Sequence, residues 1–146
     1  MLIFYASLHI RLVSVTGYAI IDLETTNMNI DQLIERIKHR PDYHRVGMIL
    51  AHNGVVRGTS RDGRPVRGLH VTVDQEKLAK VITEHTSRPG IIDILVEIAS
   101  GRDLAVGDDV MALVVAGDIR ENVISTLHDT LDAIKSTVTH KTEYFI

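Results

Sequence analysis

Arginine is concentrated in one short segment of the chain, which holds Arg57, Arg61, Arg64 and Arg67. An arginine side chain presents a planar fork that can hold a phosphate or a carboxylate through two hydrogen bonds at once. The segment is therefore a candidate anion-binding site. A solvated hairpin that uses charge to keep a strand edge soluble would need the same residue types. Residue types alone favour the solvated hairpin.

Two lysines near the end of the chain, Lys135 and Lys141, are candidates for chemistry. A lysine amine can polarise a substrate or move a proton, and partial burial would lower its pKa. Lys135 also has a structural explanation, because the helix dipole favours a cation near a helix C-terminus. We expect Lys135 at the edge of an apolar helix face, where it would be partly buried.

The histidines form no metal-binding pattern. None lies in a ligand motif such as H-E-x-x-H, and the chain has no cysteine to complete a site. Glycine-rich nucleotide loops and a G-x-S-x-G elbow are also missing from the sequence. We expect no metal or cofactor, and surface or boundary positions for His9, His39, His44, His52, His70, His85, His128 and His140.

Composition limits the function classes. A chain of 146 residues fits one domain with a real core, and its net charge of −3 argues against a general nucleic-acid binder. Without cysteine, any sulfur that is moved must arrive on another molecule. Met1–Val15 is apolar but lacks a basic leader, and no segment reaches the roughly 20 apolar residues of a membrane helix. We expect a cytoplasmic protein.

The hydrophobic pattern predicts an α+β domain with a mixed or antiparallel sheet and flanking helices, because strands and helices interleave without a strict βαβ rhythm. A bulge at Gly54 would let a strand continue into Val55, and the turn at Leu104, Gly107 and Asp108 would lead into another strand. The expected strands are Tyr18–Leu23, Val46–Ala51, Val66–Val73 (as the strand returning from the arginine segment), Ile91–Ala99 and Val110–Ala116.

Capping residues predict where three helices begin. Asn29 and Asp74 would cap the first two, which end before Pro41 and at about His85. Asp118 and Glu121 resemble a capping box at the start of the third. Its apolar stripe would consist of Ile119, Val123, Leu127, Leu131, Ile134 and Val138.

The last third of the chain holds the pattern L-x-x-G-D-D-V-M-A-L-V-V-A-G-x-x-R, an amphipathic helix and a basic ending. Upstream, Val46 and Gly47 precede the run Gly54-Val55-Val56-Arg57. In this order, over about residues 18–145, the chain resembles the large (catalytic) subunit of molybdopterin synthase, the MoaE family.

The resemblance implies a homodimer of domains of the α/β hammerhead type. It also implies a partner, a small ubiquitin-like sulfur-carrier subunit whose C-terminal Gly-Gly bears a thiocarboxylate. The substrate would be cyclic pyranopterin monophosphate, which receives the sulfur and becomes molybdopterin. Arg57 and Arg120 would bind substrate, Lys135 would act as acid, base or electrophilic amine, and Lys141 would assist.

The chain departs from the family at two positions, with Ile119 in place of a histidine and His52 in place of an aromatic residue. These changes leave a second hypothesis open, a non-catalytic dimeric module of the same fold that binds a partner or an anion. A histidine-dependent hydrolase is a third option that no spacing supports.

Arg120 and Lys135 would be roughly 20 Å apart on one helix. Either the helix begins later than Arg120, or two subunits build the pocket.

The apolar strand Val110–Ala116 supports the homodimer independently. With its neighbours it is more uniformly apolar than one small domain needs on both faces. We therefore expect a second copy to bury part of that surface.

Overall fold

The computed structural model describes residues 12–15, 18–21 and 28–146. The predicted end of the first strand at Leu23, and the residues before Leu12, lie outside this part. In chain order the elements are β1 (Leu12–Val15), β2 (Tyr18–Ile21), α1 (Ile30–Lys38), η1 (Tyr43–Arg45), β3 (Met48–Val55), β4 (Val66–Val73), α2 (Gln75–Thr86), β5 (Ile91–Ile98), β6 (Asp103–Ala105), β7 (Asp109–Gly117), α3 (Arg120–Ala133), η2 (Ile134–Val138) and β8 (Thr139–Phe145).

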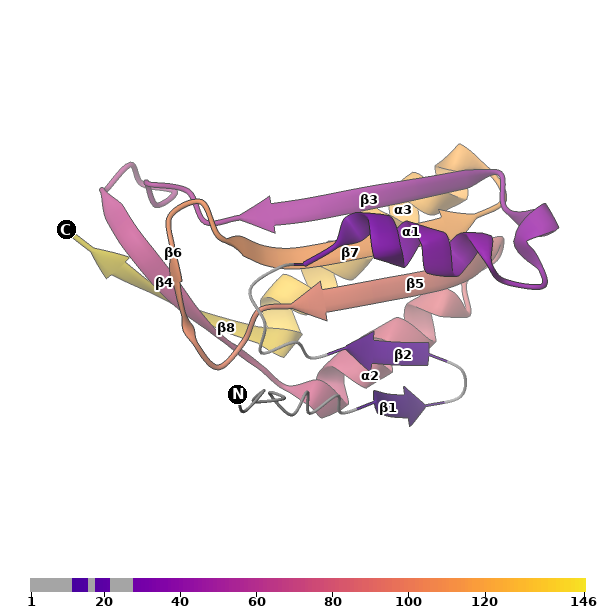
Figure 1. The fold of residues 1–146 in the computed structure, drawn as a ribbon, viewed down its shortest axis with the longest axis horizontal. Helices are drawn as coiled ribbons and strands as arrows, with labels where there is room; N and C mark the ends of the chain where they lie inside the picture. Colours follow the sequence, from indigo (N-terminus) through magenta and orange to yellow (C-terminus); the bar gives the residue numbers. More distant parts are fainter. Residues whose placement is uncertain (1–11, 16–17, 22–27) are drawn as a thin grey trace, which may run out of the picture.

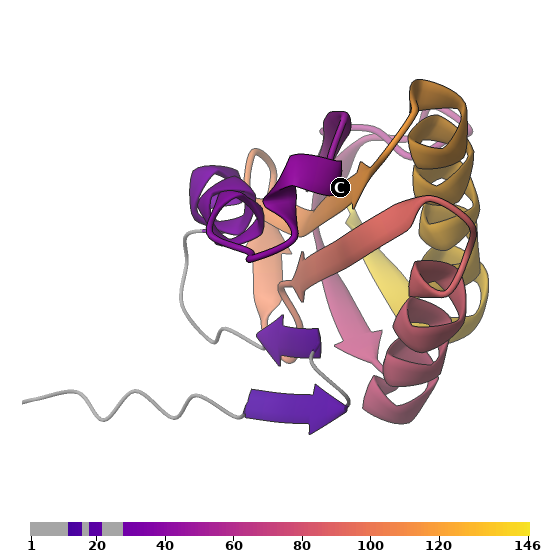
Figure 2. The ribbon, with the colours of Figure 1, turned by 90° about the vertical axis from the view of Figure 1, so that its right-hand side faces the viewer.

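Two sheets organise the described residues (Figure 1). The larger has the strand order β1-β2-β5-β7-β3, with β2 and β5 parallel and the other pairs antiparallel. The smaller has the order β6-β4-β8 and is antiparallel throughout. Helix α1 lies on one face of the large sheet, and α2 and α3 lie on the other (Figure 2). This arrangement confirms the predicted α+β class with a mixed sheet and flanking helices.

Each face of the large sheet has its own hydrophobic core. Side chains of α1, such as Leu33 and Ile37, pack on Ala112, Val114 and Ala116 of β7. On the other face the apolar residues of α2, α3 and η2 pack on alternate strand residues such as Leu113 and Val115. The two clusters follow the period-two alternation of strands. Strand β5 is buried along its whole length because both of its faces are covered.

The covering of both faces removes the sequence argument for a homodimer. Residues 111–117 of β7 are buried within a single chain, because helices from the same subunit lie on either side. The expectation that a second copy is needed to cover Val110–Ala116 is therefore wrong. The prediction of a homodimer then needs other surfaces.

Local capping confirms the first two predicted helix starts. The Asn29 side chain accepts a hydrogen bond from the Gln32 amide at 3.2 Å, and Asp74 accepts one from the Lys77 amide at 3.1 Å. The bulge is confirmed as well, because the register of β3 on β7 shifts between Gly54 and Val55.

The third helix start was predicted wrongly. Its N-cap is Ile119, and Asp118 lies before it, accepting bonds from the Ile119 amide and the Asn122 side chain at 2.6 and 2.9 Å. Glu121 pairs with Arg120 at 3.0 Å instead of returning to the cap, so no capping box forms. Ile119 is 53% exposed and does not belong to the apolar stripe.

The small sheet contains two further corrections. Val66–Val73 forms a strand but does not return beside β3, because it pairs with β6 and β8. The final helix reaches Val138 through the π-helical turn η2, as its apolar pattern suggests, but the strand after it was not predicted: Thr139–Phe145 pairs with β4 over its whole length. β8 lacked a signal because its first residues are polar on both faces.

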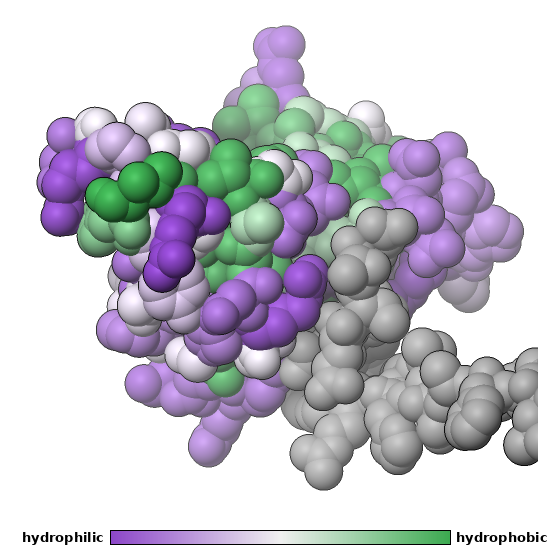
Figure 3. Space-filling model, turned by 60° about the vertical axis from the view of Figure 1, so that its left-hand side comes forward, coloured by the Kyte–Doolittle hydropathy of each residue, from purple (hydrophilic) through white to green (hydrophobic). Residues whose placement is uncertain are grey.

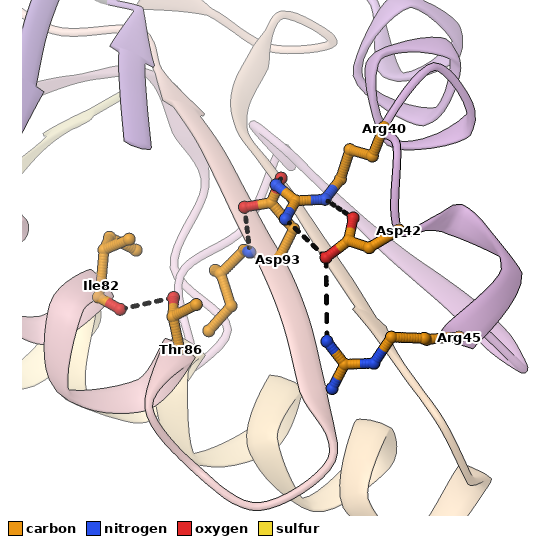
Figure 4. A network of polar contacts seen from close by, with 7 residues as sticks. Arg40, Asp42, Arg45, Ile82, Thr86 and Asp93 are labelled. Atoms are coloured by element: carbon orange, nitrogen blue, oxygen red, sulfur yellow. Dashed lines mark hydrogen bonds and ion pairs between the residues drawn. The ribbon is translucent and has the colours of Figure 1, made fainter. Parts of the chain in front are cut away.

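A buried ion pair connects the segment that follows α1 to the large sheet (Figure 4). Arg40 donates to Asp93 at 2.9 Å, and its Nε donates to Asp42 at 2.8 Å. The Asp93 side chain is only 8% exposed and also accepts a bond from the Ile94 amide. Burial raises the pKa of Asp93, and the Arg40 guanidinium opposes that increase. The charged form of Asp93 therefore depends on Arg40.

No helix within the described ranges is long and apolar enough to cross a membrane.

Candidate functional site

A cavity of about 550 Å³ opens where the two sheets meet. The end of β3, the arginine segment, the inner face of the small sheet and the turn η2 surround it. The face of the molecule seen in Figure 3 carries apolar residues among hydrophilic ones. The apolar part of the lining is formed by Val55, Val66, Leu69, Val71, Ile98, Val110 and Met111. Such a concave, partly apolar space with a few polar groups is typical of a small-molecule site.

Three of the four predicted site residues line this cavity: Arg57, Lys135 and Lys141. They come from a loop, a helix end and a strand that are far apart in the sequence. The fourth, Arg120, does not line it. Arg120 begins α3, its side chain is 79% exposed, and it pairs with Glu121. Since the helix begins at Arg120, the alternative of a later helix start is excluded.

Arg57 is positioned by the turn between β6 and β7. The Gly107 amide donates to the Val56 carbonyl at 2.8 Å, and the Val56 amide donates to Asp108 at 2.9 Å. Gly107 has a φ of +94°, which glycine adopts without strain. The predicted turn at Leu104, Gly107 and Asp108 is therefore confirmed. It holds the chain just before Arg57 against the large sheet.

The arginine segment divides into two parts. Arg57 and Arg61 line the cavity. Arg64 is held elsewhere, because it pairs with Asp62 at 2.9 Å and stacks on the Phe145 ring at 3.8 Å. Arg67 lies 5.9 Å from the centre of the Tyr144 ring. Arg64 and Arg67 therefore fit the interpretation of this segment as a solvated hairpin.

Lys135 lies in the π-helical turn η2, which ends the last helix. The turn buries Ile134 and Val138, and the Thr139 amide donates to the Ile134 carbonyl. Single π-helical turns within α-helices are frequent at functional sites, and η2 follows α3 directly. Lys135 itself is exposed although it lines the cavity, so the expected partial burial is wrong for the single chain.

Strand β8 brings Lys141 and Glu143 to the cavity. Their side chains form an ion pair at 2.6 Å. Hydrogen bonds to the Asp103 carboxylate connect the three strands of this sheet, because His70 of β4 and Tyr144 of β8 both contact it, at 2.8 and 2.9 Å. These two hydrogen bonds lower the pKa of Asp103. The same hydrogen bonds hold β8 in the small sheet and so position the strand that carries Lys141.

The cavity is strongly cationic. Four basic side chains line it, against a single carboxylate, that of Glu143. Burial lowers the pKa of the His52 imidazole, and the charge of Lys135 lowers it further. A cationic lining of this kind suits an anionic ligand. Within the part of the chain that the structure describes, no cluster of three ligand side chains could hold a metal ion.

Sequence reasoning missed His52 and Glu143 as residues of the cavity, and residue types favoured a solvated position for Arg61, which also lines it. Position alone could have suggested His52, because it precedes Gly54 by two residues and so shares its face of the strand. Glu143 carried no signal, since its strand was not predicted.

Comparison with protein families gives one match. A family model described as MoaE protein matches residues 23–137. A search of curated protein sequences found no significant match.

Solved structures share the fold at low sequence identity. Molybdopterin synthase from Staphylococcus aureus matches with a TM-score of 0.60 and 20% identity, over 73% of this chain and 85% of that one. Molybdopterin cofactor biosynthesis protein E from Burkholderia multivorans matches with a TM-score of 0.65 and 18% identity, over 82% of each chain. A complex of subunits 1 and 2 of the molybdopterin-converting factor from Helicobacter pylori matches with a TM-score of 0.60 and 15% identity, over 81% and 84%.

Proposed function

This chain belongs to the MoaE family, whose role is in molybdenum cofactor biosynthesis, and we propose that it is the catalytic subunit of a molybdopterin synthase. It would transfer sulfur from a thiocarboxylated small subunit to cyclic pyranopterin monophosphate in the cytoplasm. The observation that carries the proposal is the single cavity that gathers Arg57, Lys135 and Lys141. The direct test is formation of molybdopterin by the purified protein with both reactants.

The residues of the cavity suit this chemistry. Arg57 would hold the phosphate of the substrate through charge-assisted hydrogen bonds. Lys135 would act on the pterin as acid, base or electrophilic amine, and Lys141, oriented by Glu143, would assist. The chain has no cysteine, so the sulfur would come from the partner.

The partner would be a small ubiquitin-like protein ending in Gly-Gly. The Helicobacter pylori neighbour was solved as a complex of two subunits, which supports a partner of this kind. Its thiocarboxylated tail would enter the cavity between the two sheets. Co-purification of a small protein ending in Gly-Gly would test this partnership directly.

Two observations favour the alternative, a non-catalytic dimeric module that binds a partner or an anion. Ile119 replaces the family's histidine and is exposed, and Lys135 is exposed as well. If the wild-type protein makes no molybdopterin with its own partner, that result would favour the non-catalytic alternative. Ile119→His is then the first variant to examine for recovered activity.

Arg57→Ala is expected to weaken binding of the substrate or of inorganic phosphate by about 1.5–3 kcal/mol, the scale of hydrogen bonds to a charged group. That loss corresponds to roughly a ten- to hundredfold higher dissociation constant. Calorimetric titration measures it. Arg64→Ala is the matched control, because Arg64 lies in the same loop but is held by Asp62 and Phe145. An unchanged constant for Arg57→Ala, with the circular dichroism spectrum intact, would argue against the phosphate role.

We expect a homodimer in solution. Arg120 could then act at a cavity of the second subunit, since it does not line the cavity of its own chain. Ile119 and Ile124, which are 53% and 50% exposed near Arg120, are candidates for the buried contact. Light scattering should give the mass of two chains, and Ile124→Lys should shift it toward one. A wild-type monomer at micromolar concentration would remove both the dimer and the shared cavity.

A further inference from the structure

His52 is a partly buried imidazole that opens into the candidate cavity. It lies on the same face of β3 as Met48 and Leu50, which pack into the core under the helices. The next residue on that face is Gly54, where a β-carbon would lie 3.3 Å from the His52 Nε2. The absence of a side chain at Gly54 therefore leaves room for the ring.

The ring nitrogens of His52 form no hydrogen bond with any residue that the structure describes. Other histidines of the chain are engaged, such as His70 with Asp103 at 2.8 Å and His85 with Thr130 at 2.7 Å. A partly buried polar group without a protein partner is available to a ligand or a substrate. The position of His52 at the cavity wall makes a bound substrate the natural partner.

Among the described groups that face this cavity, histidine and glutamate are the residue types that accept a proton most readily near neutral pH. Lysine and arginine side chains ordinarily carry their protons there. The carboxylate of Glu143 is paired with Lys141 at 2.6 Å. The groups around His52 come from the arginine segment, the turn η2 and strand β8, and they are Arg57, Arg61, Lys135, Lys141 and Glu143.

We propose that His52 is the proton acceptor of this cavity, an inference that rests on the proposed transfer function. In the proposed transfer the thiocarboxylate sulfur attacks as an anion, and water must then release the small subunit from the resulting thioester: the water oxygen bonds to the acyl carbon as the acyl C–S bond breaks. The lone pair of a His52 ring nitrogen takes a proton from this water, and the resulting imidazolium gives it to the departing sulfur. Burial lowers the pKa of the His52 imidazole, and the charge of Lys135 lowers it further, so the ring is neutral and ready to accept a proton.

A pH–rate profile tests the proposal with His52→Gln, which keeps a polar side chain but cannot titrate. The wild-type rate should fall at acid pH with an inflection below about 6.5, the ordinary pKa of histidine. In His52→Gln the rate should be about a hundredfold lower, and that inflection should vanish. Added imidazole should partly restore His52→Ala. His140→Gln, on an exposed residue that does not line the cavity, is the control and should keep the wild-type profile.

A second readout does not depend on turnover. The ring protons of His52, followed by NMR as the pH changes, should titrate below the ordinary range, and Lys135→Met should move that titration upward. A His52→Gln enzyme with wild-type rate and acid inflection overturns the inference and leaves the proposed function standing. An NMR titration unaffected by Lys135→Met also overturns it. A wild-type protein that transfers no sulfur overturns the proposed function and the inference together.

Discussion

Lys135→Ala is expected to lower the rate of molybdopterin formation by at least about a hundredfold, the lower range for an acid–base group. The ammonium group lines the same cavity as Arg57 and lies in the π-helical turn after α3. A rate assay with the thiocarboxylated small subunit and cyclic pyranopterin monophosphate measures the effect. The melting temperature should change by only a few degrees, because Lys135 is exposed and forms no ion pair with another described residue.

Two further variants separate the possible roles of Lys135. Lys135→Arg keeps the positive charge but holds its proton too tightly to exchange it, so a rate close to that of Lys135→Ala would indicate proton transfer. Lys80→Ala is the control, because Lys80 is 75% exposed on α2 and lies away from the cavity. If Lys135→Ala makes molybdopterin at nearly the wild-type rate, Lys135 has only its structural role. That role, complementing the helix dipole, contributes about 0.3–1 kcal/mol.

Arg40→Ala is expected to destabilise the fold by about 3 kcal/mol at neutral pH. Removing one partner of a buried ion pair leaves an uncompensated charge, which costs roughly 3–5 kcal/mol. The lower end applies because the Arg40 side chain is 30% exposed. Denaturant unfolding at fixed pH measures the loss. Arg45→Ala is the matched control, since Arg45 pairs with Asp42 only at 3.9 Å and is 62% exposed. Its effect should stay below about 1 kcal/mol.

The instability of Arg40→Ala should depend on pH in one direction. Burial raises the pKa of Asp93 above its unfolded value, and without Arg40 the opposing attraction is lost. A carboxyl whose folded pKa is raised keeps its stability below the unfolded pKa and loses it as the pH rises through the folded pKa. The deficit should therefore be largest near pH 8 and shrink toward pH 4. A deficit that is the same at both values would show that Asp93 is not the group responsible.

Most local structure in the described part of the chain could be predicted from the residues of each segment. Asn29 and Asp74 marked two helix starts, because a side-chain oxygen satisfies free amides at a helix N-terminus. The bulge at Gly54 and the turn at Gly107 were predictable from glycine positions. The two caps and the turn at Gly107 depend on hydrogen bonds between residues a few positions apart, so the local sequence encodes them.

The site was predictable in part, through the family resemblance. Arg57, Lys135 and Lys141 were chosen from motifs, and all three line one cavity. Their functional roles remain predictions. Residue types alone would have left Arg57 in a solvated hairpin and Lys135 at a helix end.

The way in which the segments combine could not be predicted from local patterns, because it depends on long-range packing. The polar strand β8 has no hydrophobic alternation of its own and exists because β4 offers it an edge, so pairing overrides its composition. That pairing brings Lys141 and Glu143 to the cavity that Arg57 also lines, and the π turn places Lys135 near His52. Arg120 lies at the start of α3 and does not line the cavity. Contacts between segments so distant in sequence depend on the packing of two sheets and three helices, which no local pattern encodes.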